Sequence, residues 1–221
     1  MTPRRISGIL IALFAALTLF APTLAAAAPP AAPQAMEIMG GQHFRTATAG
    51  RCTTGFSVEH TTYGHGFLAY GGCGQLNDPV YAADGSVIGV VKIKSAAWLW
   101  VDLAAGWTAL PYVAPNHPVT GGAQSPVGAS VCRAGSTTGW HCGIVQALNQ
   151  TVSYPGGVLY GLTRTNVCAE PGDTGGPYLS GGNAQGIHVG GSGNCASGGT
   201  SFFQPLRPIF AAYPSLSLMT V

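Results

Sequence analysis

The sequence predicts an all-β protein made of two small antiparallel β-barrels that pack together with a cleft between them. From residue 40 onward, runs of about five to eight apolar or β-branched residues alternate with Gly, Asn, Asp or Pro, as in short strands joined by tight turns. The chain has 33 Gly and 16 Pro to build such turns. A loop-like stretch at 114–126 divides it into two halves, each long enough for one barrel.

Six runs show this rhythm most clearly, and we predict each as a strand: Thr54–Val58, Gly66–Tyr70, Val87–Ile93, Trp98–Leu103, Val158–Thr165 and Gln185–Val189. The segment Arg207–Tyr213 follows Pro205 and predicts a short C-terminal helix. Within a domain of 38–221, we assign the first barrel to about 38–113, the connection to 114–126 and the second barrel to about 127–213.

The N-terminal segment predicts an exported protein. Arg4 and Arg5 precede an apolar run from Ile9 to Leu24, and alanines follow at 25–28. A basic start, an apolar middle and a small-residue exit are typical of a signal peptide, here 1–28. The apolar run is short of the roughly 20 residues of a membrane-spanning helix. Residues 29–37 form a short Pro/Ala-rich leader, so we expect no long pro-segment, and no membrane association after cleavage.

Charge and cysteine content limit the possible partners. Without Arg4 and Arg5, the nine basic residues become seven, which equals the seven acidic ones. No basic cluster suggests nucleic acid as a partner. An even number of cysteines in an exported chain predicts three disulfides, and no C-x-x-C spacing suggests a metal. We therefore expect a monomer without metal or cofactor.

The sharpest motif is NVCAEPGDTGG at 166–176, a Gly-rich bend whose backbone N–H groups could hold an oxyanion. Together with RCTTGFSV (51–58), VGASVCRAGSTTGWHCG (127–143) and GGTSFFQP (198–205), it resembles the bacterial secreted S1 peptidases of the streptogrisin and alpha-lytic protease group. The resemblance covers most of 38–213 and implies two six-stranded barrels of the chymotrypsin-like fold. It also implies three disulfides: Cys52–Cys73, Cys132–Cys142 and Cys168–Cys195.

The positions that align with the family's catalytic triad carry other residues. The nucleophilic Ser of GDSGG is Thr174 here, the general-base His of TAGHC is Gly72, and the orienting Asp aligns with Ala97. A hydroxyl is a poor nucleophile unless a base removes its proton. Loss of a whole triad costs on the order of 10⁶ in turnover. We therefore expect no peptide-bond cleavage.

The resemblance implies that the framework around these positions is kept. The N–H groups of Gly172 and Thr174 would form the oxyanion hole, and a buried Arg133–Asp173 pair would fix their loop.

The strand at 188–191 would bind a substrate-like ligand. The backbone of Val189, Gly190 and Gly191 could pair with an extended peptide. Where the family has a Ser that faces the triad Asp, this chain has Val189, which indicates a site repacked as core beside Ala97. In glutamate-selective members a His faces the primary specificity pocket. His188 thus predicts either a preference for an acidic side chain or a pocket wall without a ligand.

Three functions remain open from the sequence. The first is a secreted pseudo-peptidase that binds an extended peptide or a protein inhibitor in the inter-barrel cleft. The second is a streptogrisin-type endopeptidase with residual or altered activity through Thr174. The third is a decayed copy without a selected role.

Overall fold

The second half of the chain closes into a six-stranded antiparallel barrel, in the order β11-β12-β13-β16-β15-β14. The computed structural model describes residues 36–154 and 156–221, so the predicted signal peptide (1–28) and most of the leader (29–37) lie outside the described residues. The barrel strands are β11 (Ser130–Gly135), β12 (Gly139–Tyr154), β13 (Gly157–Thr165), β14 (Pro177–Ser180), β15 (Asn183–Asn194) and β16 (Gly198–Pro205).

Two of these strands are longer than the sequence rhythm suggested. β12 has 16 residues and β15 has 12, and both contain register shifts where an extra residue bends the strand. In β15 the shift lies between His188 and Gly190. The strand therefore bends at the segment that the family resemblance assigns to ligand binding.

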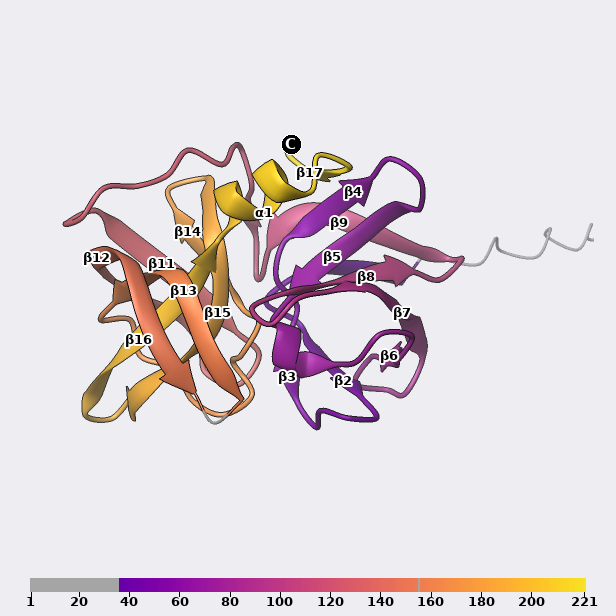
Figure 1. Ribbon diagram of the computed structural model, residues 1–221. Coiled ribbons are helices and arrows are strands. Elements are labelled where there is room, and N and C mark those ends of the chain that lie inside the picture. The colour runs from indigo at the N-terminus through magenta and orange to yellow at the C-terminus, as the bar shows by residue number, and fades with distance from the viewer. Residues whose placement is uncertain (1–35, 155) are drawn as a thin grey trace, which may run out of the picture. The chain divides into compact units, whose positions relative to one another are not determined.

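The first half is also barrel-like, but its strands do not form a simple six-stranded ladder. One sheet has the order β17-β4-β5-β8-β7-β6-β2-β3, and its strands are labelled in Figure 1. A smaller sheet has the order β1-β9-β10. The strands are β1 (Met36–Gly40), β2 (His43–Thr46), β3 (Cys52–Thr53), β4 (Ser57–His60), β5 (Gly64–Ala69), β6 (Pro79–Tyr81), β7 (Val87–Lys94), β8 (Leu99–Leu103), β9 (Trp107–Val113) and β10 (His117–Pro118). A single-turn 3₁₀ helix, η1, spans Gly71–Cys73.

The all-β class with two barrel-like halves is confirmed, with three local corrections. β1 pairs with β9 in parallel rather than antiparallel, and it begins at Met36, inside the stretch predicted as leader. β10 lies within the predicted connection 114–126. The predicted strand Thr54–Val58 is a strand only from Ser57. Before it, the Gly55 N–H donates to the Leu68 carbonyl at 2.7 Å and the Leu68 N–H donates to the Phe56 carbonyl at 2.9 Å, so two residues face one and the regular ladder is interrupted.

The other predicted strands coincide with β5, β7, β8, β13 and β15, and the predicted helix is α1 (Leu206–Ala212). After α1, the chain returns to the first half: β17 (Leu216–Leu218) pairs with β4. The predicted end of the second barrel at 213 did not include this return. The return of the chain to the first half buries Leu216, and full burial of a leucine contributes about 2 kcal/mol.

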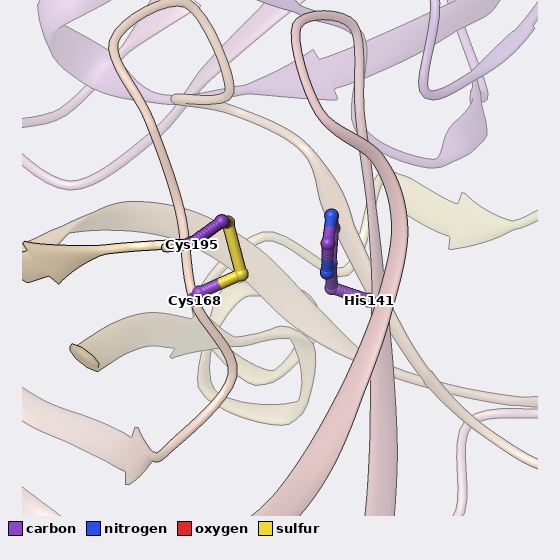
Figure 2. Close-up of side chains that lie close together, drawn as sticks. All are labelled: His141, Cys168 and Cys195. Carbon is purple, nitrogen blue, oxygen red and sulfur yellow. A yellow bond between two sulfur atoms is a disulfide. The ribbon is translucent and has the colours of Figure 1, made fainter. Parts of the chain in front are cut away.

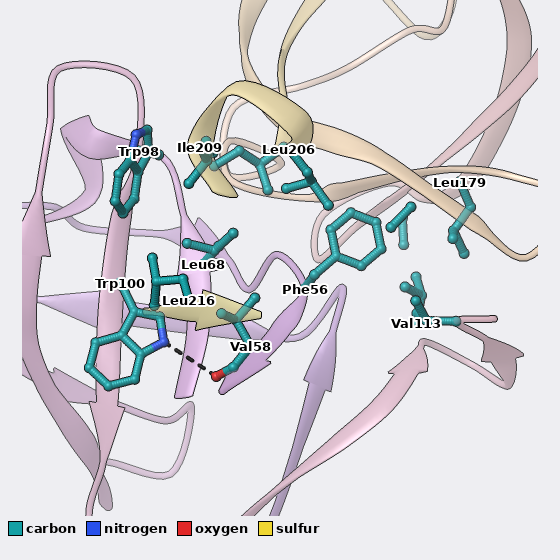
Figure 3. Packing of buried hydrophobic residues seen from close by; sticks show 14 residues of the cluster. Phe56, Val58, Leu68, Trp98, Trp100, Val113, Leu179, Leu206, Ile209 and Leu216 are labelled. Atoms are coloured by element: carbon teal, nitrogen blue, oxygen red, sulfur yellow. Dashed lines mark hydrogen bonds between the residues drawn. The ribbon is translucent and has the colours of Figure 1, made fainter. Parts of the chain in front are cut away.

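One hydrophobic cluster joins the two halves, and α1 lies over it (Figure 3). Phe56 and Leu68 of the first half share the cluster with Leu179 of the second, and the helix contributes Leu206 and Ile209. The Trp100 indole N–H donates to the Val58 carbonyl at 3.4 Å, which satisfies a polar group inside the cluster. This shared core holds the two halves against each other.

The three disulfides are those that the resemblance implied: Cys52–Cys73, Cys132–Cys142 and Cys168–Cys195. They close loops with sequence separations of 21, 10 and 27 residues. In the chain-entropy account, loops of these lengths each stabilise the fold by about 3 kcal/mol. Within the described residues, no helix has the length and apolar character needed to cross a bilayer.

Candidate active site

The bend at 170–176 is held in a conformation that leaves two N–H groups free. Gly172 has φ +98°, a region that favours glycine, and a Cβ there would lie 2.8 Å from Cδ of Arg51. The Gly172 carbonyl accepts from the Thr53 hydroxyl at 2.7 Å, and Thr53 N–H donates to the Thr174 carbonyl at 2.8 Å. Within 36–154 and 156–221, neither the Gly172 nor the Thr174 N–H has an acceptor. Two unpaired N–H groups on one bend are what the predicted oxyanion hole requires.

A buried ion pair fixes the bend from behind. Asp173 and Arg133 lie 3.1 Å apart, and both side chains are fully buried. The carboxylate also accepts from the Glu170 N–H at 2.9 Å and the Thr138 hydroxyl at 2.7 Å. Burial opposes ionisation, but these hydrogen bonds and the Arg133 charge outweigh it and lower the pKa of Asp173. A side chain at Gly135 would overlap the pair.

Gly72, the position aligned with the family's base, lies under the ring of Tyr70. A Cβ at Gly72 would be 3.0 Å from Cδ1 of that ring and closer still to Cε1. Any side chain at position 72 therefore collides with Tyr70 as it stands. Gly72 itself is exposed, in the turn η1 that leads to the Cys52–Cys73 disulfide.

Ala97 and Val189 belong to one apolar cluster, as the sequence predicted. Val189, 3% exposed, is buried in it with Leu159 and Leu162, and Tyr70 and Ala97 pack against it. No polar partner is required of an alanine and a valine in such surroundings. Position 72 thus lies beside the Tyr70 ring, and position 97 packs against the same apolar cluster as that ring.

Thr174 lies next to these residues. Its carbonyl is 3.9 Å from Sγ of Cys73, the residue after Gly72. On the other side, Gly175 N–H donates to the His188 carbonyl at 2.8 Å, and His188 N–H donates to the Gly176 carbonyl at 2.8 Å. The structure thus brings the bend, η1 and the strand at 188–191 to one place.

His188 is part of the wall of a cavity of about 250 Å³ that Thr174, Gly190 and Gly191 also line. Its side chain is buried, and Nδ1 is 3.2 Å from the Tyr178 hydroxyl, which in turn lies 2.8 Å from the Ser201 hydroxyl. Burial, assisted by the Arg133 charge, lowers the pKa of His188 to about 3. A neutral imidazole offers a hydrogen bond but no charge to a ligand, which favours the pocket-wall interpretation.

Solvent exposure increases along the strand from residue 189 to residue 191. Val189 is buried, Gly190 is half-buried and Gly191 is exposed. Tyr154 lies against this edge, since a Cβ at Gly190 would be 2.9 Å from Cε1 of its ring. An extended ligand paired with this edge would thus contact the Tyr154 ring.

A cluster of His141, Cys168 and Cys195 has the composition of a metal site but not its chemistry (Figure 2). Both sulfurs are joined in a disulfide, so neither is a thiolate that could bind a metal. His141 Nε2 is also 3.1 Å from the Thr138 carbonyl. The imidazole therefore packs beside a structural disulfide.

The sequence analysis missed the role of Tyr70, and with it a second cavity of about 340 Å³ between Tyr70, Lys94 and Tyr154. A signal was present in the aligned motif. The segment that aligns with TAGHC is Ala69-Tyr70-Gly71-Gly72-Cys73. Tyr70 stands in place of the motif's alanine, two residues before Gly72 stands in place of its histidine.

Comparisons with known proteins agree with this architecture. The family model described as Trypsin matches residues 78–212. The chain is 46% identical to streptogrisin-C of Streptomyces griseus over 196 residues, covering 85% of this chain and 42% of that protein. It is 37% identical to serine protease 2 of Streptomyces fradiae, covering 74% of this chain and 100% of that protein. The chain thus spans less than half of streptogrisin-C.

A similar solved structure is the chymotrypsin of Cellulomonas bogoriensis. It is 41% identical, with a TM-score of 0.76, over 84% of this chain and 100% of that one.

Proposed function

This chain belongs to the trypsin family of peptidases, and from that premise we propose that it is a member that binds an extended peptide in its cleft without hydrolysing it. The proposal rests on one observation: Gly72 has no side chain, and the Tyr70 ring occupies the space beside it. A general base must come within hydrogen-bond reach of the nucleophile. Thr174 has no such partner among the residues at positions 70–73.

The contacts of His60, His117 and His188 do not favour any of the three as a substitute base. His60 Nδ1 accepts from the Thr62 N–H at 3.1 Å, and His117 stacks on Trp140 at 3.8 Å between ring centroids. His188 is joined to the bend through its backbone, but its ring is buried and lies 3.2 Å from the Tyr178 hydroxyl. An imidazole that is buried, neutral and already bonded is poorly placed to take a proton from Thr174.

A binding role is supported by the parts of the site that remain. The N–H groups of Gly172 and Thr174 have no acceptor, the Arg133–Asp173 pair behind them is fully buried, and the strand at 189–191 becomes exposed at Gly191. The unpaired N–H groups and the strand edge can bond to a peptide backbone without a catalytic side chain, while the buried pair fixes the bend that carries those N–H groups. The occupant that fits is an extended peptide or the binding loop of a protein inhibitor.

We further propose that the protein is exported. The three disulfides among the described residues support an oxidising compartment, and the sequence of 1–28 supports a signal peptide.

The test combines turnover and binding on the purified protein. We expect no hydrolysis of a panel of fluorogenic peptides, and saturable binding of fluorescein-labelled peptides measured by anisotropy. Thr174→Ala is the matched variant, and it should bind the same peptides with affinity within about twofold of the parent, since it removes only a hydroxyl and a methyl. Hydrolysis that disappears in Thr174→Ala would establish the endopeptidase alternative. If the protein folds cooperatively but binds no peptide, the remaining interpretation is a decayed copy without a selected role.

A further inference from the structure

A cavity of about 340 Å³ lies beside the cleft, where the family would have its imidazole. Its lining combines apolar groups with four long polar side chains. The polar ones are Tyr70, Gln75, Lys94 and Tyr154, and the apolar part includes Leu159 and Ala96. The cavity shares no residue with the lining of the His188 cavity.

Lys94 and Tyr154 bring hydrogen-bond donors to this lining, and Gln75 brings both a donor and an acceptor. The Tyr154 hydroxyl is buried and has no hydrogen-bond partner. The Lys94 ammonium has three hydrogens, of which one is donated to the Gly71 carbonyl. A buried donor without an acceptor costs about 1–3 kcal/mol, so this cavity would gain stability from a ligand that brings acceptors.

The charge in the cavity is also uncompensated. Within the described residues, the Arg133–Asp173 pair is the only ion pair, so Lys94 has none. Asp78 is the acidic group whose charge acts on Lys94, but it does not line the cavity. Its carboxylate already accepts from the Thr48 hydroxyl at 2.6 Å and from the Gln75 N–H at 2.8 Å. Burial lowers the pKa of Lys94 more than Asp78 raises it. A negative group beside the ammonium would reverse that penalty.

We propose that this cavity is a carboxylate-binding subsite, in which Lys94 and the Tyr154 hydroxyl hold a carboxylate and the apolar wall holds the methylenes that carry it. The identity of the natural ligand, a peptide with an acidic group, rests on the proposed function. The subsite itself rests on the cavity and its unpaired donors. Gly72 also lines this cavity, and a side chain at that position would meet the Tyr70 ring, which forms part of the lining.

The subsite is tested first with glutarate alone, independently of any peptide. We expect glutarate to shift the ring resonances of Tyr70 and Tyr154 in NMR spectra of the full protein, and the neutral analogue glutaramide to leave them unchanged. Lys94→Met should weaken glutarate binding at least about tenfold, as expected for the loss of a charged hydrogen bond. Lys92→Met is the control, because Lys92 is exposed on the same strand and is not part of the lining.

Absence of a glutarate-induced shift, or equal binding by Lys94→Met and the parent, would overturn the subsite. Tyr154→Phe keeps the ring and removes only the unpaired hydroxyl, so it is the second test variant if Lys94→Met does not fold. It should weaken glutarate binding severalfold. Unchanged affinity in Tyr154→Phe would equally overturn the assignment.

Labelled peptides then identify the source of the carboxylate. A peptide whose binding falls when one Glu becomes Gln uses a side chain, and one whose binding falls on C-terminal amidation uses the terminus. Peptides that bind with no preference in either comparison would refute the subsite as part of the cleft. Glutarate binding without any peptide binding would refute the proposed function and leave the subsite standing.

Discussion

The buried imidazole of His188 should make the stability of this protein depend on pH in a defined window. His188 is 3% exposed, and burial, with the Arg133 charge, lowers its pKa from 6.5 to about 3. In the unfolded chain the ring would take up a proton near its ordinary pKa. As the pH falls below 6.5, the His188 imidazole binds a proton in the unfolded state but not in the folded state. The free energy of unfolding therefore decreases.

The expected size follows from these two pKa values. Integrating the linkage relation from about pH 7.5 to about pH 5 gives a loss of about 2 kcal/mol for this one group. His43 has a pKa lowered by burial, Arg51 and Arg45, so it adds a smaller loss of the same sign. Asp173, also with a lowered pKa, acts in the same direction but only around and below its ordinary value of 3.8. Between pH 7.5 and 5, His188 should therefore dominate.

The measurement is urea unfolding at both pH values with the disulfides intact. His188→Gln cannot take up the proton, so its loss of stability between the two pH values should be smaller than the parent's by about 2 kcal/mol. His65→Gln is the control, because His65 is exposed and its removal should leave the parent's pH dependence unchanged. Parallel pH dependences for His188→Gln and the parent would refute the reasoning that His188 is buried in the neutral form.

Two further substitutions test the framework of the site. Arg133→Met leaves the Asp173 carboxylate buried and unpaired, so we expect the free energy of unfolding in denaturant to fall by about 3–5 kcal/mol. The double variant Arg133→Met/Asp173→Asn should recover much of this loss, because it removes the unpaired charge. No recovery in the double variant would show that Arg133 acts through packing alone. Gly72→His should cost about 1–3 kcal/mol, because the new side chain meets the Tyr70 ring, and adding Tyr70→Ala should relieve that overlap. In a double-mutant cycle, purely additive effects of these two changes would contradict the contact.

Much of the fold could be predicted because it is encoded locally. The alternation of apolar residues with turn residues placed β5, β7, β8, β13 and β15 correctly, since strand formation depends on neighbours within a few positions. Pairing between distant strands has no such local signal. The parallel register of β1 with β9 and the return of β17 to β4 were accordingly missed.

The candidate site divides in the same way. The sequence by itself determined which side chains stand at positions 72, 97 and 174, and it therefore determined that no imidazole is attached to residue 72. Only the tertiary structure decided what occupies the space beside it, because Tyr70, Lys94 and Tyr154 come from separate segments that meet only when the two halves pack. A missing side chain can be read from one position, but the cavity it leaves depends on every chain segment that surrounds it.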